Sequence, residues 1–243
     1  MDPRTRDVAP LTPATCLAHL DRAVDDFAAV LDRGDLDAPV PGCSPWTVTD
    51  LAHHLGGIHR WARTAVVERR AGAEEVDGAP TDRAALTDWF RTGAGELTSA
   101  LRVADPDAPA WAMAPPPTVG FWIRRQAHET AMHARDAQAA CGSAAPLPAD
   151  LALDGMDEVV GMFLPRQVGL GRIPAPAVPV VLAADEGGTV AIGPDAPPVA
   201  TVRGPAEALL LLLWHRVPLD DPRLTVSGDR AAAATVLAAA LTP

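Results

Sequence analysis

The chain has 243 residues, of which 48% are hydrophobic and 21% are charged, and its formal net charge is −11. This length and composition are typical of a globular protein with a substantial core, arranged as one large domain or two smaller ones. The acidic balance argues against nucleic acid as a partner, because phosphate binding requires clustered basic side chains. It favours a soluble protein that handles small molecules.

The sequence contains no signal for export, membrane insertion or disulfide bonding. No apolar stretch follows the charges at the N-terminus, so we expect no signal peptide. The longest apolar run, Ala208–Trp214, is far too short to cross a membrane. Cys16, Cys43 and Cys141 are an odd, widely spaced set without a CxxC pair, which indicates reduced thiols in a cytoplasmic protein. Isolated cysteines of this kind are usually small buried hydrophobes.

Cap residues and apolar stripes predict four helices in the first 141 residues. The first lies between Pro13 and Gly34, the second runs from Thr47 to about Arg70, the third follows Thr81, and the fourth occupies Phe121–Ala140. A proline-rich stretch, residues 105–118, should be a long loop before the last helix. Four helices connected in this way favour a bundle whose site is built from inward-facing side chains.

The pattern changes after a linker at Gly142–Asp150. A short helix over 151–164 is followed by two β-branched runs within Val178–Ile192, which predict a hairpin. Two more strands are expected at 199–204 and 223–229, each leading into a helix. We therefore predict two domains of different fold class. An all-α four-helix bundle occupies residues 1–145, and a small α+β domain occupies residues 146–243.

Five of the seven histidines lie in two windows, 50–62 and 127–133. At about 100° per residue, His54 falls within the apolar stripe of the second helix, whereas His53 points almost opposite and His59 lies to the side. Glu129 and His133 are one turn apart on the same face of the fourth helix. A divalent metal shared by these inward-facing groups would remove their desolvation cost. An ion pair at the surface and a hydrogen-bonded core histidine remain alternatives.

Four segments occur in an order that resembles a known family: "CSPWTVTDLAHHLGGIHRWA", "RRQAHETAMHARDA", "LLLLLWHR" and "LTVSGD". The chain resembles the mycothiol-dependent maleylpyruvate isomerase family of actinobacteria. The resemblance implies a DinB-like four-helix bundle followed by a sterol-carrier-like α+β domain. It also implies a divalent metal, usually Zn²⁺, held by His54, Glu129 and His133, which are the residues selected by the helical faces. Mycothiol would be the thiol cosubstrate.

Three protein ligands would leave one coordination position open, as in catalytic zinc sites. A thiol in that position would be deprotonated at neutral pH and would add to an electrophilic carbon of a small substrate. Its expulsion after bond rotation would give cis–trans isomerisation, and its retention would give S-transfer.

Further residues are candidates for binding and orientation. Arg216 is a candidate catalytic residue, because arginine is suited to clamp a carboxylate. Arg125 and Trp122 are candidates for binding the thiol, although a surface charge and a core aromatic are the alternatives. Asp136 would orient His133 or be an ordinary surface carboxylate.

Two other functions remain open. In a metal hydrolase the open position would carry water, and activity would need no thiol. A non-catalytic protein that binds small molecules would keep the fold without turnover, and the sterol-carrier-like half favours this reading mildly. A set of two histidines and one carboxylate also suits ferrous oxygenases, but the helical bundle counts against that chemistry. Substrate identity is not encoded in any of these motifs.

Overall fold

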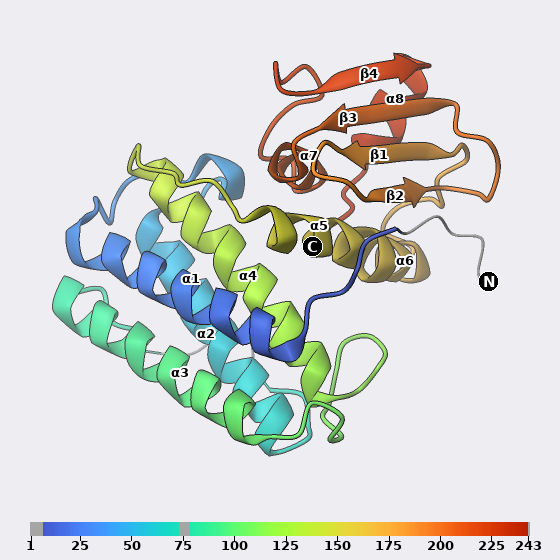
Figure 1. Ribbon diagram of the computed structural model, residues 1–243. Helices are drawn as coiled ribbons and strands as arrows, with labels where there is room; N and C mark the ends of the chain where they lie inside the picture. The colour runs from blue at the N-terminus through green and yellow to red at the C-terminus, as the bar shows by residue number, and fades with distance from the viewer. Residues whose placement is uncertain (1–6, 73–77, 243) are drawn as a thin grey trace. The chain divides into compact units, whose positions relative to one another are not determined.

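The computed structural model describes residues 7–72 and 78–242, which form two compact units (Figure 1). Among the described residues, one unit comprises residues 11–72 and 78–146, and the other comprises residues 7–10 and 147–242. A backbone hydrogen bond of 3.2 Å from the Asp7 N–H to the Thr189 carbonyl joins the N-terminal segment to the second unit. The leading residues thus belong structurally to the α+β unit and not to the bundle.

The first unit is a bundle of four long helices (Figure 1). They are α1 (Pro13–Arg33), α2 (Val48–Val67), α3 (Arg83–Val103) and α4 (Val119–Ala140). Both α1 and α2 pack against α3 and α4. Each helix buries an apolar stripe, and the largest fully buried side chains of the unit come from all four helices. The predicted four-helix architecture is confirmed.

The helix starts follow the capping signals with small shifts. At α2 the capping box is complete, since the Thr47 hydroxyl accepts from the Asp50 N–H and the Asp50 carboxylate accepts from the Thr47 N–H. Helix α3 begins later than expected, because Asp82, and not Thr81, caps it. Helix α4 begins earlier than expected, because Thr118 accepts from the Phe121 N–H.

Helices α2 and α3 approach closely through two glycines. A Cβ atom at Gly56 would lie 2.1 Å from the Trp89 ring, and one at Gly93 would lie 2.3 Å from the Arg60 guanidinium. Arg60 donates hydrogen bonds to the carbonyls of Gly56, at 3.0 Å, and of Trp89, at 2.8 Å. Its guanidinium carbon lies 4.0 Å from the Trp89 ring centroid, which adds a cation–π contact. The glycine pair in α2 therefore permits helix–helix contact at Gly56.

Three tryptophans, from α2, from α4 and from the connection before α4, form an aromatic cluster. The Trp61 ring centroid lies 5.0 Å from that of Trp122 and 5.6 Å from that of Trp111. The Trp122 indole N–H donates to the Trp111 carbonyl at 2.5 Å, and the Trp122 side chain is fully buried. Trp111 comes from the proline-rich connection between α3 and α4, so this cluster ties the long loop to the bundle core.

The second unit begins with one long helical stretch. Helix α5 (Ala149–Glu158) continues through a π-helical turn, η2 (Val159–Phe163), into α6 (Leu164–Gly169). This stretch is longer than the helix expected from the sequence. Gly171, with a φ of 68°, follows its end and adopts the left-handed conformation that glycine tolerates.

A four-stranded sheet completes this unit (Figure 1). Its strands are β1 (Val180–Ala184), β2 (Thr189–Ile192), β3 (Ala200–Gly204) and β4 (Thr225–Gly228), in the order β2-β1-β3-β4. The predicted hairpin is confirmed as the antiparallel pair β1–β2, with Leu182 opposite Val190. Strand β3 pairs parallel with β1 and antiparallel with β4. Helices α7 (Ala206–Leu213) and α8 (Arg230–Leu237) both pack against β1 and β3.

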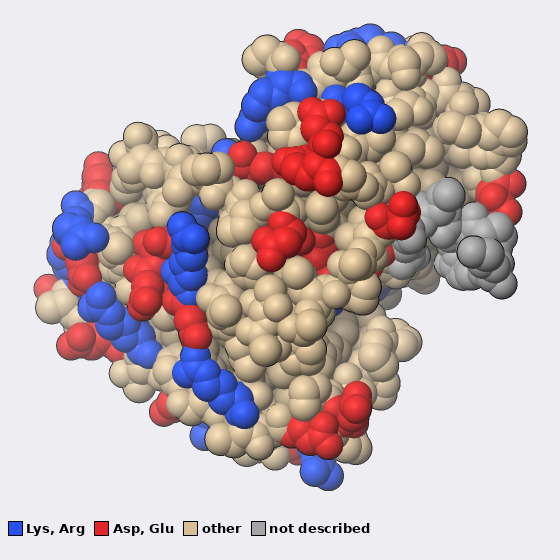
Figure 2. Space-filling model, in the orientation of Figure 1, with Lys and Arg blue, Asp and Glu red and all other residues tan. Residues whose placement is uncertain are grey.

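Charges of both signs are interspersed on the face of the bundle seen in Figure 2. Arg91 of α3 pairs with Asp32 of α1 at 2.7 Å, and Arg102 of α3 pairs with Asp21 of α1. These exposed pairs bring acidic and basic side chains of neighbouring helices together. Among the described residues, no helix combines the length and the apolar character needed to cross a lipid bilayer.

Candidate metal centre

His54 of α2 and Glu129 and His133 of α4 converge on one point in the bundle. The Nε2 atoms of His54 and His133 each lie 3.3 Å from the same carboxylate oxygen, Oε1 of Glu129. One ligand atom from each of the three residues lies within 4.8 Å of the others. The one-turn spacing of Glu129 and His133 puts both on the face of α4 that meets α2. The structure thus brings together the three residues predicted from the sequence.

The second carboxylate oxygen of Glu129, Oε2, forms an ion pair with Arg125, one turn earlier on α4. The Arg125 Nη2 lies 2.5 Å from Glu129 Oε2, and the two side chains are only 4% and 12% exposed. Burial acts to raise the pKa of the Glu129 carboxyl, but Arg125 and then His133 outweigh it and hold this pKa well below its usual range. Glu129 is therefore an ionised carboxylate with Oε1 directed at the two imidazoles.

His133 uses its two ring nitrogens in different directions. Its Nε2 faces Glu129, and its Nδ1 lies 3.2 Å from Oδ2 of Asp136. Burial acts to lower the pKa of His133, but the Glu129 carboxylate, followed by Asp136, raises it well above the ordinary value. The expected orienting contact from Asp136 is thus present in the structure, and Asp136 is a buried residue and not a surface carboxylate.

His54 is the most accessible member of the three. Its side chain is 28% exposed, compared with 12% for Glu129 and 7% for His133. The Trp46 ring packs on one side of it at 4.8 Å between centroids, and the His133 ring meets it edge-on at 5.2 Å. Solvent therefore reaches the centre beside His54, whereas Glu129 and His133 lie behind it.

His59 is buried, which the helical-face reading did not predict. It is fully buried, and its Nε2 lies 3.0 Å from the Thr130 hydroxyl. Burial lowers the pKa of His59 to about 3, so the imidazole is neutral. His59 lies beside the apolar stripe of α2, but it still faces a neighbouring helix. Because α2 packs against both α3 and α4, the buried part of its circumference is wider than the apolar stripe alone. His53 instead lies 2.7 Å from the Pro80 carbonyl.

The two candidate thiol-binding residues have other contacts. Trp122 is fully buried within the aromatic cluster, and its indole N–H is used by Trp111, so a cosubstrate has no surface of this side chain to contact. This prediction is corrected: Trp122 is a core residue. Arg125 is 3% exposed and pairs with Glu129, so in this structure its charge acts on a proposed metal ligand.

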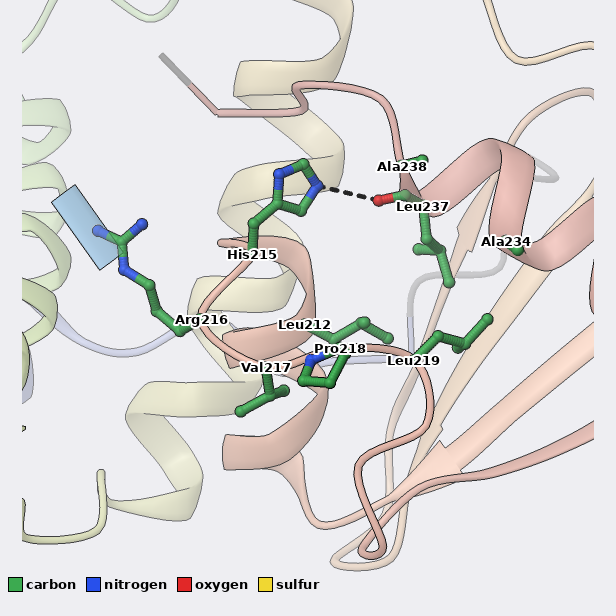
Figure 3. A pocket seen from close by; sticks show the side chains of 9 residues that line it. All are labelled: Leu212, His215, Arg216, Val217, Pro218, Leu219, Ala234, Leu237 and Ala238. Carbon is green, nitrogen blue, oxygen red and sulfur yellow. Dashed lines mark hydrogen bonds between the residues drawn. The ribbon is translucent and has the colours of Figure 1, made fainter. Parts of the chain in front are cut away.

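Arg216 lies in the second unit, at the edge of a cavity of about 450 Å³ (Figure 3). The cavity is lined largely by apolar side chains from the end of α7, the following loop and α8, among them Leu212, Leu219 and Leu237. The Arg216 Nη1 donates to the Trp214 carbonyl at 2.9 Å. Figure 3 shows His215 Nε2 directed at the Leu237 carbonyl, 3.0 Å away. Arg216 therefore belongs to the lining of an apolar pocket, but in Figure 3 its guanidinium points away from the apolar side chains.

The donor set at His54, Glu129 and His133 fits a divalent transition metal. Imidazole nitrogens and a carboxylate oxygen are ligands of zinc and related ions. The carboxylate on Nδ1 of His133 is the contact that orients a metal-binding histidine, because it leaves Nε2 available as a ligand. A buried carboxylate facing two imidazoles is also the charge distribution that a cation would stabilise.

Both units match models of one protein family. The family model described as "Mycothiol maleylpyruvate isomerase N-terminal domain" matches residues 17–138, and the "MDMPI C-terminal domain" model matches residues 150–235. Two Mycobacterium tuberculosis proteins, the uncharacterized proteins MT0763 and Rv0738, are each 28% identical over 163 residues, which is 64% of this chain and 83% of theirs.

Solved structures share the fold. The crystal structure of the mycothiol-dependent maleylpyruvate isomerase matches with a TM-score of 0.65 at 14% identity, over 90% of this chain and 95% of that one. A histidine-to-alanine mutant of the isomerase matches with a TM-score of 0.64 over the same shares. The two family models together cover most of the sequence and both units. The chain therefore belongs to the mycothiol maleylpyruvate isomerase family.

Proposed function

We propose that this protein is a thiol-dependent isomerase with a divalent metal, most simply Zn²⁺, at His54, Glu129 and His133, and with mycothiol as its thiol cosubstrate. The observation that carries the proposal is the convergence of two imidazole nitrogens on one carboxylate oxygen, each at 3.3 Å. Family membership supplies the thiol-dependent isomerisation, and the donor set supplies the metal.

A divalent cation at this centre would act as a Lewis acid that favours the thiolate form of a bound thiol at neutral pH. The residues of the chain hold the geometry for this chemistry. Arg125 fixes Glu129 through Oε2 and leaves Oε1 toward the imidazoles. Asp136 accepts from Nδ1 of His133, so that Nε2 keeps its lone pair. The partial exposure of His54 gives the cosubstrate a route to the centre.

The isomerisation requires no net change in the thiol. The thiolate sulfur adds to one carbon of a double bond conjugated with a carbonyl group, which leaves a single bond at that position. Rotation about this bond and loss of the same thiolate restore the double bond in the other geometry. A cis-unsaturated keto acid of the maleylpyruvate type has the required conjugation. Arg216, in the second unit, is a separate candidate for binding an anionic group.

The first test is the metal content of the native protein beside a His54→Ala variant, both purified without chelators or a histidine-rich tag. We expect about one divalent ion per chain in the native protein and a loss of that ion in the variant. A matched His53→Ala variant should keep the metal, since His53 contacts the Pro80 carbonyl. No metal in the native protein would refute the metal-dependent function.

The second test separates the thiol-dependent reaction from hydrolysis. The metal-loaded protein is assayed with a cis-unsaturated keto acid in the presence and absence of mycothiol, and the double-bond geometry of the product is read by NMR. Turnover that requires the thiol supports the isomerase. Substrate cleavage that proceeds without any thiol would instead establish a hydrolase.

A further inference from the structure

The turn from Val40 to Trp46, which we call the Cys43 turn, contacts the candidate metal centre on two sides. Cys43 Sγ lies 3.5 Å from Oδ2 of Asp136, and the same oxygen lies 3.2 Å from Nδ1 of His133. Three residues further on, the Trp46 ring packs against His54. This one short segment therefore reaches both proposed histidine ligands. Cys43 contacts Asp136 and the His133 imidazole, and Trp46 contacts His54.

The backbone of the Cys43 turn is held by its own hydrogen bonds. The Cys43 N–H donates to the Val40 carbonyl at 3.0 Å, and the Trp46 N–H donates to the Cys43 carbonyl at 3.0 Å. The Val40 N–H in turn donates to the Trp46 carbonyl at 2.8 Å. The short helix η1 (Pro41–Cys43) packs against α4. The position of the Cys43 side chain is thus fixed by a closed turn.

The direction of the hydrogen bonds follows from the chemistry of the groups. An ionised carboxylate only accepts, so both the Cys43 thiol and the His133 Nδ1–H donate to Oδ2 of Asp136. With its Nδ1–H donated to Asp136, the His133 ring directs Nε2 toward Glu129 and His54, which makes Nε2 the nitrogen available to a metal. Asp136 is 4% and His133 is 5% exposed, so water competes little for these contacts.

We propose that Cys43 is a positioning residue of the metal centre: its thiol holds Asp136, and Asp136 holds His133 with Nε2 directed at the metal. This inference rests on the proposed metal-dependent function and extends it to a side chain outside the three proposed ligands. Outer contacts of this kind change metal affinity, because they set the orientation and basicity of the ligand. Loss of the thiol donor should therefore weaken metal binding without removing a ligand.

A direct role for Cys43 as a ligand is a distinct arrangement. Ligand atoms of Cys43, His133 and Asp136 also lie within 4.8 Å of one another. A cation among these three atoms would need Nδ1 of His133, which in this structure contacts Asp136. The proposed centre uses the other nitrogen of this ring, Nε2, so coordination by sulfur is a competing arrangement that the test must detect.

The test measures the zinc affinity of the full-length protein by competition with a chromophoric chelator, in thiol-free buffer. The variants are Cys43→Ala, Cys43→Ser and Asp136→Asn. Cys141→Ala is the matched control, because the Cys141 Sγ lies 3.9 Å from the Asp35 carbonyl and takes part in no candidate metal group of the described residues. We expect a loss of affinity of about 10- to 100-fold for Asp136→Asn and about five-fold for Cys43→Ala, since a thiol is a weak donor. Cys43→Ser keeps a donor and should stay within about two-fold of the native protein.

The outcomes separate this inference from the proposed function. A native protein that binds no zinc refutes the metal function and the inference with it. Zinc binding that is equal in the native protein and in Cys43→Ala overturns the inference alone, and so does a Cys43→Ser variant as weak as Cys43→Ala. In the cobalt-substituted native protein, a thiolate-to-metal charge-transfer band that disappears in Cys43→Ala would show Cys43 to be a ligand, which also overturns the positioning role.

Discussion

Replacing His59 with glutamine should make the bundle less sensitive to acid. The His59 imidazole is fully buried, and its pKa is lowered to about 3 from an ordinary value of 6.5. Between these two pH values the unfolded chain binds a proton at this position and the folded chain does not. Stability is therefore complete above pH 6.5 and falls as the pH decreases toward 3. Glutamine does not titrate and retains a polar group for Thr130.

The size of the effect follows from the pKa difference. Each pH unit below 6.5 removes about 1.4 kcal/mol, so at pH 5 the native protein loses about 2 kcal/mol through this histidine. Over the whole interval to pH 3 the loss approaches about 5 kcal/mol. Other groups also titrate, but they are common to both proteins and largely cancel when the two pH dependences are subtracted.

The assay is urea unfolding at pH 8 and pH 5, in the presence of a chelator, followed by tryptophan fluorescence. All tryptophans except Trp214 lie in the bundle, so the signal reports mainly on this unit. We expect the native protein to lose about 2 kcal/mol more than His59→Gln between the two pH values. Equal losses in the two proteins would refute the assignment of a buried, neutral His59.

Three other predictions concern packing, the Glu129 pair and metal release. Gly56→Ala should destabilise the bundle by about 1–3 kcal/mol, because the added Cβ would clash with the Trp89 ring. Gly95→Ala is the control, since no atom lies within 4 Å of an added Cβ there, and it should raise the free energy of unfolding by up to about 1 kcal/mol. Thermal unfolding measures both. Glu129→Met should abolish zinc retention and cost about 3 kcal/mol or more by leaving the Arg125 charge buried. The double variant Arg125→Met/Glu129→Met should recover stability but not the metal, and equal stability of the single and double variants would contradict the pairing. Because the pKa of His133 lies well above 6.5, protons should compete with zinc already above that pH, and an affinity that stays constant down to pH 6.5 would contradict this.

The proposed ligand set could be predicted from the sequence because its geometry is mostly local. Glu129 and His133 are one turn apart on α4, so helical periodicity alone places them together. His54 required one further step, since its place within the apolar stripe of α2 indicates an inward direction. Which inward-facing residues of two helices meet is not contained in either periodicity. The helical faces made a shared site a hypothesis, and the family resemblance supported the same three residues.

The contacts that the sequence did not predict depend on tertiary packing. Cys43 and Asp136 are 93 positions apart, and nothing in the spacing of three cysteines relates one of them to a carboxylate. Trp122 lies on the same helix as the proposed ligands Glu129 and His133. Its contact with Trp111 depends on where the proline-rich loop packs, which helical periodicity does not predict. The assignment of the leading residues to the second unit depends on a hydrogen bond to β2, which a polar N-terminal segment does not indicate.

The contacts of Trp89 with Gly56 and of Arg60 with Gly93 determine the position of His54 along the bundle axis. Trp89 of α3 fits above Gly56 of α2, and Arg60 of α2 fits above Gly93 of α3. A shift of one helix along the other would bring a bulky side chain against a residue with a Cβ atom, so a single register of the two helices is accommodated. His54 lies two residues before Gly56, within the same turn of α2. The translation of α2 relative to α3, and with it the depth at which this imidazole meets α4, is therefore specified by two missing methyl groups.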